Sequence, residues 1–320
     1  MRPTRTRAGL LPAVLLLLAA ACADAGPSVR PSGGGPSSPA GSAAAFPVTV
    51  TDDDGVTVTI QAEPERIVTF APSATEIVFA LGLGERLVGV SGPFDDFPPE
   101  ARRVAEVGGA GDFGVDPNIE QVVSLQPDLF LTIKGGDQWK ERLRDLGVPV
   151  VTLDATDLDD LLEDIRTVGR ITGATEGAES LANQMQAEAQ GIADALAGRP
   201  AVTCFYETFY PPLYTVGPGT FIYDLLERAG CDPVTAPADQ QYPEWSVEDL
   251  VRQSPEVYLV SSESGSSPRA VAKRAGFQAV SAVAAGRVVP VNADLVERPG
   301  PRVLAGLRLL AEALHPDVLV

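Results

Sequence analysis

The feature that most constrains the fold of this chain is an internal repeat. Residues 118–131 read NIEQVVSLQPDLFL, and residues 246–259 read SVEDLVRQSPEVYL. Each copy begins with a helix-capping residue, continues as a short helical pattern that ends before a Pro, and closes with an apolar strand pattern. Because a repeated helix–strand unit indicates repeated architecture, the sequence predicts two structurally related lobes.

Each copy of the repeat carries a Glu in the first turn of its predicted helix, Glu120 in the first and Glu248 in the second. One such Glu is explained by compensation of the helix dipole, worth about 0.3–1 kcal/mol. The matched pair favours a shared function at two equivalent places.

Apolar strand patterns alternate with helical patterns on both sides of the repeat copies. This alternation predicts an α/β fold in which two Rossmann-like lobes each hold a mostly parallel sheet. Predicted strands cover residues 67–70, 87–90, 129–133, 148–153, 202–206, 257–260 and 288–291, and a hairpin covers 48–51 and 56–60. Predicted helices cover residues 74–81, 119–125, 139–146, 158–171, 222–229, 247–253 and 303–314.

One helical stretch is much longer than the others. Residues 176–196 contain no Pro and show apolar residues at helical spacing, and the Gly-Arg-Pro of residues 198–200 ends the pattern. We therefore predict an N-terminal lobe over residues 47–173, a rigid bridging helix over 174–198 and a C-terminal lobe over 199–320.

The first residues have the features of an export signal. A basic segment precedes a short apolar run, and the run ends in small residues before Cys22. We expect a lipoprotein signal peptide over residues 1–21 and lipidation of Cys22, with plain secretion as the alternative. All but four of residues 23–46 are Gly, Pro, Ser or Ala, which predicts a flexible linker behind the anchor over residues 22–46. The protein would be exported and held by lipid alone to the outer face of the cytoplasmic membrane.

The composition excludes several classes of protein. The chain has 43 Asp and Glu against 24 Lys and Arg, a net charge of −19 that disfavours nucleic acid as a partner. It has one His, His315, and three Cys, which is too few for a His-rich or four-thiolate metal site. A Ser-His-Asp enzyme would depend on His315 alone, close to the C-terminus.

Two cysteines remain after Cys22. Cys204 lies in a predicted strand, and Cys231 follows a predicted helix. In an oxidising compartment the two could form a disulfide, and the alternative is a pair of buried free thiols.

Several motifs in order resemble one known family. They are RIVTFAPSATEIVFALG at 66–82, Val-Ser at 90–91, FPPE at 97–100, Gly-Gly at 135–136, LGVPVV at 146–151, Pro-Pro at 211–212 and DLVERPGPR at 294–302. The set resembles the helical-backbone (class III) substrate-binding proteins of cobalamin, ferric-siderophore and haem ABC importers, and it is closest in pattern to the cobalamin-binding members. The resemblance covers residues 47–315.

The resemblance implies an extracytoplasmic substrate-binding lipoprotein, acting as a monomer. Such a protein captures a cobalamin-type corrinoid between its lobes and delivers it to the permease dimer of an ABC importer with its ATPase. The ligand would be a small-molecule metal chelate, and no separate cofactor is implied. Glu120 and Glu248 match the glutamates that dock on the permease.

The resemblance also implies residues of the ligand site. By position these are the aromatic residues Phe94, Phe113, Phe209, Tyr210 and Tyr242 and the polar pair Asp294 and Arg298. A large flat ligand needs aromatic faces and a few placed polar groups. The alternative for the aromatic residues is ordinary core packing, which the polar neighbours of Tyr242 disfavour.

Two other functions compete with this one. A ferric siderophore or haem could replace the corrinoid, although an anionic siderophore would favour several Arg in the cleft, where Arg298 is the one clear candidate. An extracytoplasmic enzyme is disfavoured, because the sequence lacks a dinucleotide fingerprint and a phosphate-binding Gly-Lys-Ser/Thr loop.

Overall fold

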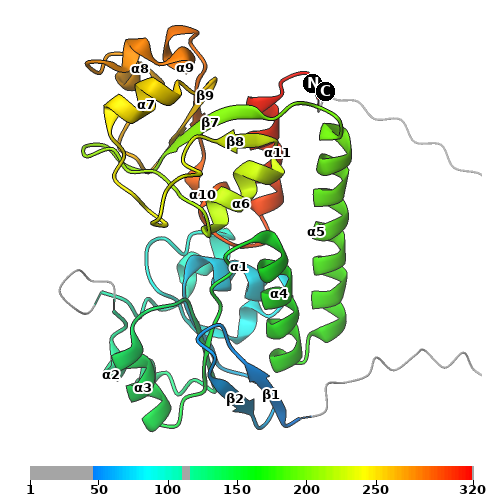
Figure 1. Cartoon of the computed structure of the whole chain (residues 1–320). Coiled ribbons are helices and arrows are strands. Elements are labelled where there is room, and N and C mark those ends of the chain that lie inside the picture. Colours follow the sequence, from blue (N-terminus) through cyan, green and yellow to red (C-terminus); the bar gives the residue numbers. More distant parts are fainter. Residues whose placement is uncertain (1–45, 110–115, 319–320) are drawn as a thin grey trace, which may run out of the picture. The chain divides into compact units, whose positions relative to one another are not determined.

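Two four-stranded parallel sheets form the frame of the chain (Figure 1). The computed structural model describes residues 46–109 and 116–318, all within one compact unit. The first sheet has the order β4 (Leu87–Gly89), β3 (Ile67–Phe70), β5 (Leu129–Thr132) and β6 (Val150–Thr152). The second has the order β10 (Val288–Val291), β9 (Val257–Ser261), β7 (Val202–Glu207) and β8 (Cys231–Pro233).

The two sheets share one topology. In each sheet, counted in chain order, the first strand (β3 or β7) lies between the second and the third. The fourth strand lies on the outer side of the third. All pairings within both sheets are parallel, which confirms the predicted α/β class with two lobes. We call the part built on β3–β6 the first lobe and the part built on β7–β10 the second lobe.

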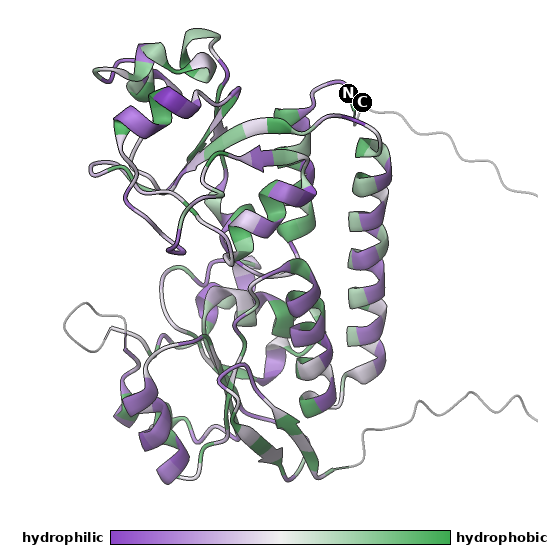
Figure 2. Ribbon diagram, in the orientation of Figure 1, coloured by the Kyte–Doolittle hydropathy of each residue, from purple (hydrophilic) through white to green (hydrophobic). Residues whose placement is uncertain are grey.

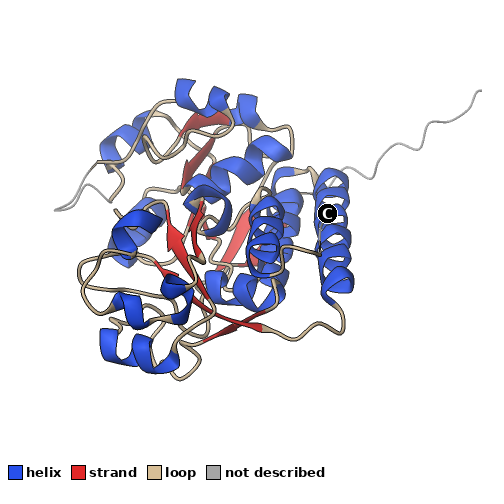
Figure 3. Cartoon of the chain, turned by 90° about the horizontal axis from the view of Figure 1, so that it is seen from above, coloured by secondary structure: helices blue, strands red, loops and turns tan. Residues whose placement is uncertain are grey.

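Helices lie on both sides of the strands (Figure 3). The helices are α1 (Pro72–Ala80), α2 (Ile119–Ser124), α3 (Asp137–Asp145), α4 (Leu158–Thr172), α5 (Thr175–Leu196), α6 (Phe221–Arg228), α7 (Val247–Gln253), α8 (Pro268–Val271), α9 (Ser281–Ala284), α10 (Ala293–Val296) and α11 (Val303–Leu314). Short 3₁₀ turns cover Gly84–Arg86, Pro99–Arg103 and Phe277–Ala279, and β1 (Val48–Thr51) pairs antiparallel with β2 (Thr57–Ile60).

The long helix α5 packs against both lobes, because it contacts α4 of the first and α11 of the second. Hydrophobic and hydrophilic residues alternate along it (Figure 2). The contact with α4 is close: a Cβ on Gly169 would lie 2.2 Å from the Cβ of Ala178. Glycine at this position therefore lets the two helix backbones approach.

The internal repeat is also a structural repeat. The side chain of Asn118 accepts a hydrogen bond from Gln121 N at 3.1 Å, and Ser246 accepts one from Asp249 N at 2.9 Å, so each copy has the predicted N-cap. The chain leaves α2 and α7 through equivalent left-handed residues, Gln126 at φ 50° and Ser254 at φ 46°.

The equivalence extends to the strand entries. The carboxylate of Asp128 accepts hydrogen bonds from the backbone of Glu65 and Arg66, just before β3. The carboxylate of Glu256 does the same for Thr203 at the start of β7, at 3.1 Å. An acidic residue of each repeat therefore ties its own strand to the first strand of its lobe.

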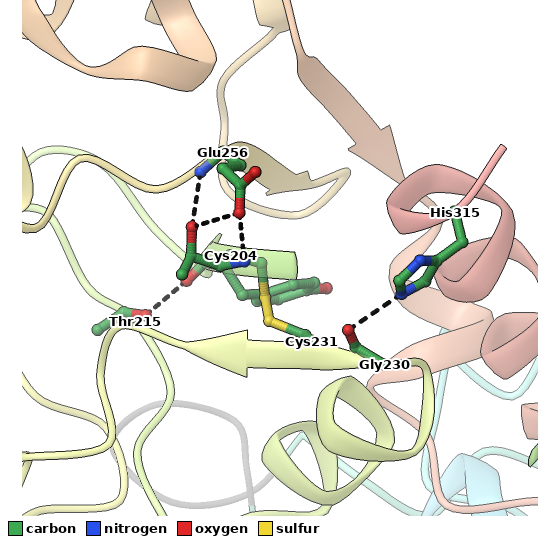
Figure 4. Close-up of a disulfide and its surroundings, with 8 residues drawn as sticks. Cys204, Thr215, Gly230, Cys231, Glu256 and His315 are labelled. Atoms are coloured by element: carbon green, nitrogen blue, oxygen red, sulfur yellow. Dashed lines mark hydrogen bonds between the residues drawn. A yellow bond between two sulfur atoms is a disulfide. The ribbon is translucent and has the colours of Figure 1, made fainter. Parts of the chain in front are cut away.

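The second lobe contains a disulfide between Cys204 and Cys231, with Cα atoms 5.8 Å apart (Figure 4). It joins the neighbouring strands β7 and β8. His315 lies nearby at the end of α11 and is 8% exposed. Its Nε2 atom lies 3.1 Å from the carbonyl oxygen of Gly230, and because a carbonyl only accepts, Nε2 carries the proton.

Every helix and strand predicted above is present in the structure, with ends shifted by at most two residues. Strand β8 and helices α8, α9 and α10 were not predicted. The three helices have four residues each, and β8 is a three-residue edge strand that ends in Pro233, so none has a readable period.

Candidate ligand-binding cleft

Three adjoining cavities form a cleft that involves both lobes. The first, which we call the aromatic compartment, is lined by Phe94 and Trp139 and has a volume of about 690 Å³. The second, the acidic compartment, is lined by Asp154 and Asp164 and has a volume of about 320 Å³. The third, the mouth, is lined by Asp294 and Arg298 and has a volume of about 290 Å³. Ile133 and Lys134 line both compartments, Phe94 lines the aromatic compartment and the mouth, and Glu297 lines the mouth and the acidic compartment. The shared lining residues make the three cavities parts of one cleft.

The aromatic compartment lies beyond the carboxyl ends of β3 and β5. Phe70 ends β3 and Thr132 ends β5, and both line the cavity. This edge, between the first and third strands of a parallel sheet, is the usual ligand site of open α/β sheets. The hydroxyl oxygen of Thr132 is buried and has no hydrogen-bond partner among the described residues.

Trp139 is a cavity residue that the sequence analysis did not identify. It lines the aromatic compartment from the first turn of α3 and packs edge-on against Phe70, with ring centroids 5.6 Å apart. A Cβ on Gly136 would lie 2.1 Å from the indole nitrogen, and Gly136 has φ 72°. The Gly-Gly pair before an aromatic residue was the available signal, because the indole occupies space that only glycine leaves free.

Two of the predicted aromatic residues stand exposed in the cleft. Phe94 is 65% exposed and lines the aromatic compartment and the mouth, and Tyr242 is 55% exposed and lines the acidic compartment. Core packing, the alternative for these side chains, is therefore ruled out for both. Exposed aromatic rings inside a concave site are suited to stacking on a flat ligand.

Phe209 and Tyr210 line none of the three cavities of the cleft. Phe209 is 46% exposed, with its ring centroid 6.5 Å from that of Tyr214. Tyr210 lies under the guanidinium of Arg274, which is 3.6 Å from the ring centroid, and packs against the hydrophobic cluster of the second lobe. Their predicted role in ligand binding finds no support in this geometry.

The predicted polar pair lines the mouth. Arg298 Nη2 lies 2.7 Å from the Asp294 carboxylate. Its Nη1 atom donates to the carbonyl oxygen of Phe94 at 3.0 Å and lies 3.4 Å from the Asp96 carboxylate in the first lobe. Burial acts to raise the pKa of Asp96, but the hydrogen bond from Arg102 and the positive charge of Arg298 outweigh it, so the pKa of Asp96 is lowered. Arg298 thus connects the two lobes where the ligand would enter.

Carboxyl groups dominate the acidic compartment. Asp154, Asp164 and Glu297 line it, and Lys134 Nζ lies 3.8 Å from Asp154. Glu297 Oε1 accepts hydrogen bonds from Tyr206 at 2.8 Å and from Ser261 at 2.5 Å, so its position is fixed from the second lobe.

Burial and neighbouring carboxylates shift two groups of this compartment. Burial, with Asp53 as the next cause, raises the pKa of Asp164 to about 9. Partial burial of the ring against the cavity wall, with the negative charges of Glu297 and Asp154, raises the pKa of Tyr242. Asp164 therefore stays uncharged at neutral pH.

The two repeat glutamates lie apart from the cleft residues, on separate lobes. Glu120 is in the first turn of α2 and Glu248 in the first turn of α7, and both are exposed. Neither carboxylate forms a hydrogen bond or ion pair with another described residue, so both are available to a partner. Phe113 and Cys22 lie outside the described residues.

The described residues contain no group of three His, Cys, Asp or Glu side chains arranged to hold a metal ion. Within this part of the chain, no helix combines the length and the apolar character needed to cross a bilayer.

Two like α/β lobes, a bridging helix and a cleft lined from both lobes define a protein that captures a small molecule between its lobes. The periplasmic binding protein family model matches residues 67–295, and the chain belongs to this family. It is accordingly an extracytoplasmic substrate-binding protein, of the class that takes a small-molecule ligand to a permease and its ATPase.

Relatives and solved structures agree with this assignment. The chain is 35% identical over 282 residues to the uncharacterized ABC transporter substrate-binding lipoprotein YvrC of Bacillus subtilis, covering 85% of this chain and 87% of that protein. It is 33% identical over 287 residues to a cobalamin-binding protein of Halobacterium salinarum, covering 85% and 75%. The crystal structure of the vitamin B12 binding protein BtuF of Vibrio cholerae is similar at a TM-score of 0.69 and 27% identity, covering 78% of this chain and 96% of that one.

Proposed function

We propose that this chain captures a cobalamin-type corrinoid between its lobes and delivers it to the permease dimer of an ABC importer. Relatives named as cobalamin- or vitamin B12-binding proteins match more than three quarters of the chain, which supports this ligand class. No catalytic step is part of the proposal. The protein acts as a monomer, held to the outer face of the cytoplasmic membrane by lipid on Cys22.

One observation carries the choice of ligand. Phe94 and Tyr242 stand exposed in the same cleft, and the Asp294–Arg298 pair lies at its mouth. A corrin offers a broad apolar face for aromatic rings and an amide-bearing edge for a carboxylate and a guanidinium. Few small ligands combine a broad apolar face with an amide-bearing edge.

Calorimetric titration of the mature protein with cyanocobalamin tests the proposal, beside haemin and a neutral ferric hydroxamate. We expect one-to-one binding of cyanocobalamin at submicromolar Kd. Phe94→Ala and Tyr242→Ala should each weaken binding at least tenfold, because each removes a stacking face from the cleft. Phe209→Ala is the matched control: its ring is similarly exposed but lines none of the three cavities, so binding should be unchanged.

A ferric siderophore or haem is the second candidate. Haem iron would need a protein ligand, and Tyr242 is the aromatic hydroxyl in the cleft. Partial burial and the charges of Glu297 and Asp154 raise the pKa of Tyr242, so formation of the phenolate that would bind iron costs more here than at an ordinary Tyr. Tight binding of haemin without binding of cyanocobalamin would replace the corrinoid with this candidate.

Docking is the second part of the proposed function. The two glutamates sit on equivalent short helices of two lobes with the same topology, and a permease dimer offers two equivalent surfaces. Exposed carboxylates that meet cationic pockets guide association and make it sensitive to salt. We therefore assign Glu120 and Glu248 to permease docking rather than to ligand binding.

A further inference from the structure

Acidic side chains outnumber basic ones in the lining of the cleft. Among the described residues, the acidic members are Glu106, Asp116, Asp154, Asp164, Glu263, Asp294 and Glu297. The basic members are Lys134 and Arg298. Carboxylates already neutralise both of these: Asp154 lies 3.8 Å from Lys134, and Asp294 lies 2.7 Å from Arg298. Each basic residue of the cleft lining, among the described residues, therefore already has a carboxylate beside it.

The surroundings of Asp164 show that the inside of the acidic compartment is unfavourable for a negative charge. Its side chain is 6% exposed and lines the cavity from α4, yet no N–H group or cation among the described residues pairs with its carboxyl group. After burial, the carboxyl group of Asp53, in the β1–β2 turn, is the neighbour that acts most strongly on Asp164. Asp160 on α4 and Asp154 after β6 add further negative charge.

The same surroundings act on any group that enters. Burial and these carboxylates hold the pKa of Asp164 near 9, so the compartment already resists one negative charge. A carboxylate on a ligand would meet the same desolvation and the same repulsion. An amide or ammonium group would instead donate to fixed acceptors, of which Glu297 is held in place by Tyr206 and Ser261.

We propose that the acidic compartment selects the ligand by charge: it accepts an uncharged or cationic hydrogen-bond-donating side group and excludes a carboxylate. This inference rests on the corrinoid proposed above, whose peripheral amides are the donor groups of that kind. A carboxylamide has two N–H donors, whereas the carboxylate of the same shape has none. A site whose acceptors bind a ligand donor discriminates strongly against an analogue without that donor. An apolar pocket discriminates much less against an analogue that lacks one methylene group.

Cyanocobalamin and its monocarboxylic acids, in which one peripheral amide is hydrolysed, provide matched ligands. We expect at least one isomer to bind the mature protein tenfold or more weakly than cyanocobalamin in calorimetric titration at pH 7. If the dissociation constant of every isomer lies within twofold of that of cyanocobalamin, the inference is overturned, because that result is expected of a compartment that does not discriminate by charge.

Asp154→Asn tests which residues cause the selection. It removes one carboxylate and leaves Lys134 without its ion-pair partner. The dissociation constant of the weakest-binding isomer, divided by that of cyanocobalamin, should therefore fall at least threefold. Asp145→Asn is the control, since Asp145 is exposed at the end of α3 and lines none of the three cavities. An equal fall in both variants would assign the effect to overall charge and overturn the local explanation.

A second ligand pair separates failure of this inference from failure of the proposed function. If the folded protein does not bind cyanocobalamin but binds haemin, the corrinoid proposal is wrong, and haemin is compared with its dimethyl ester. Charge selection then predicts tighter binding of the ester, which lacks the carboxylates. Equal or weaker binding of the ester would overturn charge selection as well.

Discussion

Arg302 binds the carboxylate of Glu76 with two hydrogen bonds, from Nε to Oε2 at 2.8 Å and from Nη2 to Oε1 at 2.5 Å. Glu76 belongs to α1 of the first lobe and is 4% exposed, whereas Arg302 directly precedes α11 of the second lobe. The guanidinium also lies 4.0 Å from the ring centroid of Phe97. The lobes are thus joined by a buried ion pair beside the cleft as well as by helix α5.

A second inter-lobe contact lies between α4 and α6. Asp224 accepts a hydrogen bond from Leu158 N at 3.0 Å, and Arg228 lies 2.9 Å from the Asp159 carboxylate. Together with Arg298 at the mouth, these contacts oppose large hinge motion. Ligand capture would therefore involve small changes in the cleft rather than wide opening of the lobes.

Arg302→Met should lower the free energy of unfolding by about 3–5 kcal/mol, because it leaves the buried Glu76 carboxylate without its partner. Urea denaturation followed by circular dichroism measures this loss. Arg102→Met is the control: the pair of Arg102 with Asp96 is largely exposed and should contribute at most about 1 kcal/mol. Equal losses in the two variants would show that the Glu76 pair is not a special contact between the lobes.

Removal of the disulfide by Cys204→Ala with Cys231→Ala should lower the free energy of unfolding by about 3.5 kcal/mol. The bond links residues separated by 27 positions, and a loop of that length restricts the unfolded chain by this order of energy. Denaturation of the double variant, and of the unaltered protein with and without reductant, measures the effect. Reductant that does not alter the stability of the unaltered protein would argue that the bond is absent in solution.

Asp164 should make the protein less stable as the pH rises from about 4 to about 9. Its pKa is about 9 in the folded chain against 3.8 for an ordinary Asp, so between these values the folded state binds more protons than the unfolded state. The free energy of unfolding then falls with increasing pH. The contribution of protonated Asp164 to stability is complete only below the ordinary Asp pKa of 3.8. Asp164→Asn keeps the shape of the protonated side chain without titrating, so the variant should be more stable than the parent at pH 8 and should show a flatter profile.

Thermal unfolding of both proteins at several pH values between 4 and 9 checks this prediction. Asp145→Asn controls for the removal of one negative charge from an acidic chain and should leave the slope unchanged. An equal or steeper loss of stability with pH in Asp164→Asn, compared with the parent, would contradict the assignment.

Glu120→Ala combined with Glu248→Ala should abolish ligand uptake and leave ligand affinity unchanged, because neither residue lines the cleft. Uptake into cells and calorimetric titration of the same variant measure the two properties. Glu141→Ala, an exposed Glu on α3, is the control and should transport normally. Loss of ligand binding in the double variant would refute the division of roles.

Much of the fold could be predicted because its patterns are local. The repeat around Glu120 and Glu248 exposed the two-lobe design, and strand and helix periods gave the main elements within two residues. The site was predicted in part. Phe94, Tyr242, Asp294 and Arg298 do line the cleft, whereas Phe209 and Tyr210, which occupy a neighbouring loop, do not.

The sequence by itself determined the lobes, the order of their elements and the two equivalent glutamates, because hydrophobic period, capping residues and turn residues act over a few positions. The tertiary structure alone decided which distant side chains meet. Trp139 on Phe70, Arg302 on Glu76, and Asp53 beside the buried carboxyl group of Asp164 come from segments far apart in the chain. Their contacts depend on how the sheets and helices pack, and packing brings together residues that no local pattern relates.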